Sequence, residues 1–221
     1  MPIVDLAFRI TGDSVPADHG YLLYSAVAAY LPALHNSNGE DEWSRVGIHP
    51  CAGTLTGNRE LALRRTSRLI IRTPTELIGD FMVLAGRTLP LAGHNIHVGT
   101  PEVFPLKLSP NLHSRLVTIK TAESPAAFLE MARRQLDSLE IQGEIALKQT
   151  KQPAALEGNP ARNRDTPVYI RRTLRIKEYE VVGYAVQVTG LTPEESRRLQ
   201  EHGIGGRRRF GCGVFIPLKK S

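Results

Sequence analysis

The alternation of apolar and polar residues divides the first half of the chain into short strands and helices. These follow the order strand, helix, strand, strand, helix, strand. The predicted segments are residues 3–10, 21–34, 46–55, 67–73, 76–84 and 96–100. Asp18 precedes the first helix and is a candidate N-cap, whereas Pro32 is expected to kink or separate its last turn.

The second half repeats the same order. A strand is predicted over residues 115–121, and Ser124-Pro125 opens a helix whose apolar residues recur at helical spacing. Thr192-Pro193-Glu194-Glu195 combines an N-cap, a proline at the first helical position and a capping-box glutamate. The other predicted segments are strands over 144–148, 169–176, 179–189 and 214–216, with a helix over about 193–202.

An order of β-α-β-β-α-β that occurs twice predicts an α+β protein of tandem ferredoxin-like (RRM-like) folds. We expect an N-terminal domain over residues 1–110 and a C-terminal domain over 111–221. RNA-binding modules use this topology with an open sheet face on which bases stack. The strands offer Tyr169, Tyr179 and Tyr184 for stacking, but no RNP-like motif accompanies them.

Composition limits the classes of protein to consider. The 221 residues are 41% apolar and 23% charged, which is ordinary for a globular protein. The N-terminus has no signal-peptide pattern and no apolar run is long enough to span a bilayer, so we expect a cytoplasmic protein without membrane contact. Cys51 and Cys212 form no CxxC pair, and His94 and His97 have no carboxylate nearby. We therefore predict no metal and no cofactor.

The net charge of +6 is unevenly placed along the chain. Residues 168–221 hold 11 of the 28 Lys and Arg residues but only 5 of the 22 Asp and Glu residues, whereas residues 1–167 are balanced. A basic excess confined to one end of the chain indicates a polyanionic partner, of which nucleic acid is the most common.

Within this basic end lies a stretch of glycines and arginines, residues 203–213, with the sequence Gly-Ile-Gly-Gly-Arg-Arg-Arg-Phe-Gly-Cys-Gly. Glycine permits positive φ and close backbone approach, so such a loop can aim successive N–H groups at an anion. Arginine forks suit phosphate. The alternative is a glycine-rich turn with a solvated basic tip. We predict RNA contacts from Gly203, Gly205, Gly206, Arg207, Arg208, Arg209, Gly211 and Gly213.

This G-h-G-x5-G-h-G stretch, where h is apolar, lies after a helix and before the last strand. It resembles the C-terminal glycine-rich loop of the CRISPR-associated endoribonucleases that cut precursor CRISPR RNA within its repeats, members of the RAMP superfamily. The doubled fold extends the resemblance over most of the chain, and Asp18-His19-Gly20-Tyr21 is similar to the start of the first helix in these enzymes. The CRISPR subtype stays open.

The resemblance implies metal-independent cleavage in which the ribose 2′-OH attacks the adjacent phosphate, leaving a 2′,3′-cyclic phosphate and a 5′-OH end. Such chemistry needs a base, an acid and positive charge on the transition state. Relatives carry a catalytic histidine at or beside the first helix, and His19 and His35 both qualify, with His19 preferred. Lys148, Tyr21 and Tyr24 are possible partners. The glycine-rich loop is expected to hold the RNA.

Basic residues outside the loop are candidates for an RNA track. Arg171 and Arg172 are neighbours on one predicted strand and must point to opposite faces of the sheet. Arg162 and Arg164 lie in a segment rich in Pro, Gly and Asn, residues 151–167, which we interpret as a loop. The expected partner is a CRISPR repeat RNA hairpin, with other effector-complex subunits as further candidates.

Two other functions remain open at this point. A non-catalytic RNA-binding RAMP subunit of a CRISPR effector complex would share the fold and the loop but would need no histidine. An unrelated ferredoxin-like enzyme with a small phosphorylated substrate would show no salt-sensitive RNA binding.

Overall fold

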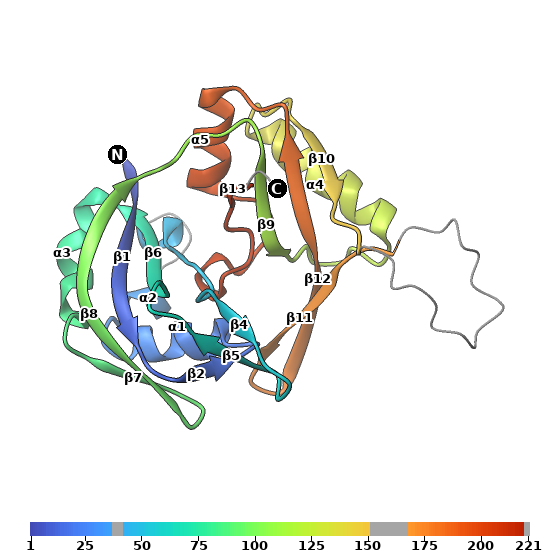
Figure 1. Cartoon of the computed structure of the whole chain (residues 1–221). Coiled ribbons are helices and arrows are strands. Elements are labelled where there is room, and N and C mark those ends of the chain that lie inside the picture. The colour runs from blue at the N-terminus through green and yellow to red at the C-terminus, as the bar shows by residue number, and fades with distance from the viewer. Residues whose placement is uncertain (37–41, 151–167, 219–221) are drawn as a thin grey trace, which may run out of the picture.

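Two antiparallel sheets, one from each half of the chain, lie side by side in the computed structural model (Figure 1). The structure describes residues 1–36, 42–150 and 168–218. The strands of the first main sheet end at Pro105, and those of the second begin at Leu112. Each half has its own hydrophobic core. We retain the division into domains 1–110 and 111–221 as a proposal.

The first sheet has the strand order β3-β6-β1-β8-β7. Its strands are β1 (Ile3–Thr11), β3 (Gly47–Ile48), β6 (Arg68–Pro74), β7 (Thr88–Leu91) and β8 (His94–Pro105). Alternate residues of β1, namely Leu6, Phe8 and Ile10, enter a core that also contains Leu23 and Val27 of helix α1 (Gly20–Ala28). A small third sheet of β2 (Ser14–Pro16), β4 (Gly53–Leu55) and β5 (Glu60–Leu63) extends from this half.

The second sheet has the order β10-β12-β9-β13, with β11 paired to the first part of β12. Its strands are β9 (Leu112–Val117), β10 (Glu144–Leu147), β11 (Arg171–Ile176), β12 (Tyr179–Thr189) and β13 (Ile216–Pro217). Helix α4 (Pro125–Ser138) packs Phe128, Ala132 and Leu136 into the core of this half. Helix α5 (Pro193–His202) begins with the predicted capping box between Thr192 and Glu195.

A ferredoxin-like unit places the strand before its first helix between its third and fourth strands. In the first half β1 lies in this way between β6 and β8, and in the second half β9 lies between β12 and β13. The predicted fold class is therefore confirmed. Two other helical segments of the first half are short. They are the 3-10 helix η1 (Glu42–Arg45) and the succession η2 (Thr75–Leu77), α3 (Ile78–Phe81) and η3 (Met82–Leu84). No helix among the described residues is long and apolar enough to cross a membrane.

The first helix ends as the expectation for Pro32 allowed, with a separate last turn, but its predicted N-cap was wrong. It stops at Ala28, and a separate short helix, α2 (Ala33–Asn36), follows Pro32. Asp18 is not its N-cap, because His19 occupies that position and makes no side-chain capping bond. The Asp18 carboxylate instead accepts the backbone N–H of Arg175 on β11, at 2.7 Å. The predicted cap was thus wrong, and Asp18 ties the second half of the chain to the start of α1.

Candidate active site

The glycine-rich loop, residues 203–213, joins α5 to the final strand and includes the 3-10 helix η4 (Arg208–Phe210). Its glycines permit backbone segments to touch. Gly203 and Gly213 both have φ near +65°, and a Cβ on Gly203 would collide with the Gly213 carbonyl oxygen. A Cβ on Gly213 would collide with the Ile204 carbonyl. The two Gly-x-Gly pairs are therefore packed against one another, which is a reason for glycine independent of any ligand.

Several N–H groups of the loop are already bonded to protein acceptors. Gly205 donates to the side chain of Gln135 at 2.6 Å, and Gly206 to the Thr118 carbonyl at 2.9 Å. Gly213 donates to the Leu116 carbonyl at 2.8 Å. The expectation that the glycine amides form an anion nest is wrong for these three residues, because their hydrogens attach the loop to β9 and α4.

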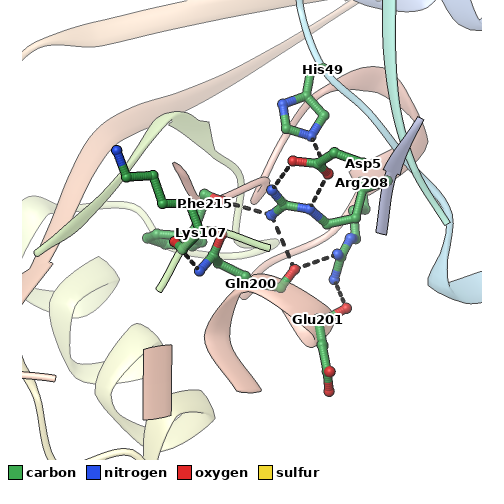
Figure 2. Close-up of polar contacts among 8 residues, drawn as sticks. Asp5, His49, Lys107, Gln200, Glu201, Arg208 and Phe215 are labelled. Atoms are coloured by element: carbon green, nitrogen blue, oxygen red, sulfur yellow. Dashed lines mark hydrogen bonds and ion pairs between the residues drawn. The ribbon is translucent and has the colours of Figure 1, made fainter. Parts of the chain in front are cut away.

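The three consecutive arginines of the loop point in different directions. Arg207 is exposed. Arg208, expected to bind RNA, turns inward and donates to the carbonyls of Gln200, at 2.7 Å, and Glu201 (Figure 2). Arg209 donates to the carbonyl of Leu34 and is hydrogen-bonded to the Tyr24 hydroxyl. Of the three, Arg208 is thus bonded to carbonyls of α5, Arg209 lies beside α1 and α2, and Arg207 is exposed.

His35 lies where the loop meets the first helical segments. It is exposed on α2, and its Nδ1 is 2.8 Å from the hydroxyl of Tyr24 on α1. The two rings are edge to face with centroids 5.2 Å apart. Because Arg209 contacts both Tyr24 and the residue before His35, a histidine, a phenol and a guanidinium converge at one place. Burial raises the pKa of the Tyr24 hydroxyl, so this phenol is protonated at neutral pH.

Aromatic side chains hold η4 against α1 beneath this group. Phe210 packs edge to face on Tyr24, with ring centroids 4.6 Å apart, and on Tyr21, at 5.5 Å. The start of α1 comes so close to η4 that a Cβ on Gly20 would collide with the Phe210 carbonyl. Gly20 thus permits the contact that brings Arg209 beside Tyr24 and His35.

His19, the preferred catalytic candidate from sequence, is 1% exposed. Its Nδ1 is 2.8 Å from the Pro16 carbonyl, and its Nε2 accepts the backbone N–H of Cys51 at 2.8 Å. These contacts fix the tautomer with the proton on Nδ1, and burial lowers the pKa of His19 to about 4. Both ring nitrogens serve the structure, so the geometry favours His35 for proton transfer to a ligand.

A cleft of about 830 Å³ separates the small β2-β5-β4 sheet from the second main sheet. Six basic residues line it, and no Asp or Glu of the described chain does: His49, Arg59, His113, Arg115, Lys148 and Arg172. Burial and the neighbouring Arg172 lower the pKa of Arg115, and burial together with Lys148 lowers that of His113. The Arg and Lys side chains of this cleft, Arg59, Arg115, Lys148 and Arg172, give it a positive potential of the kind that attracts a polyanion.

Among the other predicted residues, Arg171 and Arg172 point to opposite faces, as the strand geometry requires. Arg172 lines the cleft, whereas the Arg171 guanidinium lies 5.8 Å from the ring centre of Tyr184 on the other face. Lys148 is a residue of the cleft, and Tyr24 is the candidate partner that contacts His35. Arg162 and Arg164 lie outside the described residues.

Histidines of the H-x-x-H pair make side-chain hydrogen bonds. His94 Nδ1 is 3.1 Å from the Ser14 hydroxyl, and His97 Nδ1 is 2.8 Å from the Thr88 hydroxyl. Within the described ranges, no group of three or more His, Cys, Asp and Glu residues is placed to hold a metal ion. Cys51 and Cys212 are both buried free thiols.

The sequence reasoning missed four basic residues of the cleft: His49, Arg59, His113 and Arg115. A usable signal existed for two of them, because His113 and Arg115 are two residues apart on one strand and must share a face. Assigning that face to the cleft requires knowledge of the packing between the two halves. Arg59 comes from a turn between β4 and β5 and carries no periodic signal.

Solved structures with the same overall fold belong to RAMP proteins. "An RAMP protein binding different RNA substrates" superposes with a TM-score of 0.68 at 10% identity and covers 98% of this chain and 100% of that one. A Cas6-related protein from Pyrococcus furiosus superposes with a TM-score of 0.66 at 11% identity, over 99% of this chain and 100% of that one. The fold is thus that of a RAMP protein.

Sequence comparison identifies the family to which the chain belongs. The family model described as Cas6 Crispr matches residues 4–220. The CRISPR-associated endonuclease Cas6 of Myxococcus xanthus strain DK1622 is 36% identical over 217 residues, which are 98% of this chain and 82% of that protein. The chain belongs to the Cas6 family and is an endonuclease of CRISPR RNA processing.

Proposed function

We propose that this endonuclease cleaves CRISPR repeat RNA by attack of a ribose 2′-OH on the adjacent phosphate. The products would carry a 2′,3′-cyclic phosphate and a 5′-OH end. The observation that carries the proposal is the convergence of His35, Tyr24 and Arg209, which brings a titratable ring, its hydrogen-bond partner and a fixed cation together beside the glycine-rich loop.

Each group has a separate task in this reaction. Tyr24 holds Nδ1 of His35, so Nε2 is the ring nitrogen that exchanges a proton with the RNA. With Nδ1–H donating to the phenol oxygen, the Nε2 lone pair takes the proton of the attacking 2′-OH, and the imidazolium so formed returns a proton to the departing 5′ oxygen. Arg209 supplies positive charge to the phosphorane-like transition state. The chemistry uses the 2′-OH of the substrate as its nucleophile and needs no metal-bound water.

The basic cleft supplies a path for the rest of the RNA. A repeat hairpin has a double-stranded stem and single-stranded flanks, and the cleft is suited to a flank because it gathers cations without carboxylates. Arg115 and Arg172 are the proposed phosphate ligands there, and Arg207 is the proposed ligand at the loop. Contacts of this kind contribute affinity and salt dependence rather than rate.

The test is incubation of the protein with synthetic repeat RNA in excess EDTA, followed by analysis of the new ends. We expect one cut with a 2′,3′-cyclic phosphate and a 5′-OH, and no cut when the nucleotide 5′ to that bond is replaced by its 2′-deoxy form. Cleavage of the deoxy substrate, or a requirement for a divalent ion, would contradict the mechanism. Binding without cleavage would contradict catalysis by this chain alone.

A further inference from the structure

A buried ionic cluster outside the proposed catalytic group connects the two halves of the chain. Arg72 of β6 is 1% exposed and binds both oxygens of Asp5 on β1, at 2.8 and 2.9 Å. The same guanidinium donates to carbonyls of the other half, those of Phe215 at 2.7 Å and Gln200 at 3.2 Å. Although burial alone would raise it, His49, whose Nε2 lies 3.5 Å from the carboxylate, and the hydrogen-bonded Arg72 hold the pKa of Asp5 below its usual range.

Arg208 of the glycine-rich loop joins this cluster from its other side. Its guanidinium donates to the Gln200 carbonyl at 2.7 Å, so Arg72 and Arg208 share one acceptor, and also to the Glu201 carbonyl (Figure 2). The last turn of a helix leaves such carbonyls without partners and attracts cations. Burial lowers the pKa of Arg208 to about 9, so it is still charged at neutral pH.

The position of Arg208 in the chain connects this cluster to the catalytic group. Arg208, Arg209 and Phe210 form the single turn of η4. Arg208 attaches one side of the turn to the end of α5, and Phe210 attaches the other side to Tyr21 and Tyr24. Because both neighbours of Arg209 are fixed, its side chain is held toward Leu34 and Tyr24.

We propose that Arg208 is a positioning residue for RNA cleavage, which holds η4 so that Arg209 stays beside His35 and Tyr24. The inference rests on the proposed function. It separates the three consecutive arginines by role: Arg207 contacts RNA, Arg208 fixes the turn from inside, and Arg209 meets the scissile phosphate. A misplacement of about 1 Å in a catalytic group costs about 100-fold in rate, so loss of the anchor is sufficient to slow cleavage.

The test measures binding and single-turnover cleavage separately for Arg208→Ala and Arg207→Ala. We expect Arg208→Ala to lower the cleavage rate constant by about tenfold or more with Kd within about twofold of wild type. Arg207→Ala, which removes an exposed side chain of the same turn, should instead raise Kd. Millimolar guanidinium should restore part of the rate of Arg208→Ala. The matched control is Arg134→Ala on the exposed face of α4, which should change neither quantity.

A readout independent of cleavage accompanies these rates. In wild type the amides of Phe210 and Gly211 donate to carbonyls of Arg207 and Arg208, at 2.9 and 3.0 Å. We expect Arg208→Ala to speed hydrogen exchange at these two amides and to leave the amides of α4 unchanged. The conservative variant Arg208→Lys, which keeps the charge without the planar fork, should lie between wild type and alanine in both rate and exchange.

Wild-type cleavage by Arg208→Ala, or a rise in its Kd that matches the loss of rate, would overturn the inference while leaving the proposed function intact. If Arg208→Ala does not fold, Arg208→Lys decides, and a wild-type rate with wild-type exchange in that variant would also overturn it. A wild-type protein that binds repeat RNA without cutting it would instead contradict the proposed function, and the exchange experiment would still test the anchor.

Discussion

The hydroxyl of Tyr24 lies 2.8 Å from Nδ1 of His35 and connects helix α1 to the short helix α2 that follows it. The contact depends on the interruption near Pro32, because in one continuous helix residues 24 and 35 would lie too far apart along the axis to touch. The break returns the chain toward α1 and leaves the histidine exposed at the glycine-rich loop. A buried phenol and an exposed imidazole thus form a pair whose outer nitrogen is available to a ligand.

Replacement of Tyr24 by phenylalanine tests this pair. The ring packing on Phe210 is retained, and only the hydroxyl that orients His35 is removed. A hydrogen bond of this kind contributes about 1 kcal/mol, so cleavage should slow roughly fivefold with unchanged RNA affinity. The rate should be measured under single-turnover conditions across pH. A variant with both the wild-type rate and the wild-type pH profile would show that Tyr24 does not orient the histidine.

His19 should matter for stability rather than for proton transfer. His19→Ala leaves the Cys51 N–H and the Pro16 carbonyl without their partner, at a cost of about 1–3 kcal/mol of unfolding free energy for each group that stays buried. Chemical denaturation measures this loss. At saturating RNA, the folded fraction of the variant should cleave at nearly the wild-type rate. A large loss of cleavage rate without a loss of stability would indicate that His19, rather than His35, transfers the proton.

The same residue predicts a pH dependence of stability. Burial lowers the pKa of folded His19 from 6.5 to about 4, so below pH 6.5 the unfolded chain binds a proton that the folded chain does not. The contribution is complete above pH 6.5 and is lost as pH falls toward 4, amounting to on the order of 3 kcal/mol. Denaturation curves between these pH values should show the loss in wild type and a flatter profile in His19→Gln.

Gly20→Ala should disturb the contact between α1 and η4. The added Cβ collides with the Phe210 carbonyl oxygen. Because this oxygen belongs to the backbone, η4 itself must move, at a cost of about 1–3 kcal/mol of unfolding free energy. Cleavage should fall together with thermal stability. Gly79→Ala is the matched control, because a Cβ there meets no described atom within 4 Å and alanine favours a helix. Equal Tm values for the two variants would contradict the packing described for Gly20.

The basic cleft should control affinity. Arg115→Ala and Arg172→Ala should each weaken binding of repeat RNA and reduce the slope of log Kd against log salt by about one, with a nearly unchanged rate for bound RNA. Fluorescence anisotropy at several salt concentrations measures both quantities. Arg171→Ala, on the opposite face of the same strand, serves as the comparison. Identical salt slopes for Arg172→Ala and Arg171→Ala would exclude the cleft as the path of the RNA.

Local patterns in the sequence were sufficient for the fold. Periodic apolar residues, the proline after the first helix and the capping box at Thr192 predicted the longer helices and most strands of the two main sheets but not β2, β5 or β7, and the doubled order predicted the tandem arrangement. The errors concern side chains whose partners lie far away in the chain. Asp18 looked like a cap because such residues usually bond locally, but its partner is the backbone of Arg175, which no local pattern predicts.

The candidate site shows the same limit. The sequence favoured His19 over His35, but it does not show the burial of the His19 ring, which depends on contacts with Pro16 and Cys51. The three arginines look equivalent in sequence, and only the packing of α5 against the loop gives Arg208 an internal role. The basic cleft forms between two halves of the chain, so its residues from β4, β5, β9 and β11 become neighbours only in the folded protein.

The central claim is that His35 transfers the proton during cleavage, and the single-turnover rate constant of His35→Ala on repeat RNA in EDTA tests it most directly. Because His35 is exposed, the substitution should leave the Tm and Kd near their wild-type values. We predict a fall of about 10²–10⁴-fold in the rate constant. A folded His35→Ala protein that cuts the repeat at the wild-type rate would contradict the account.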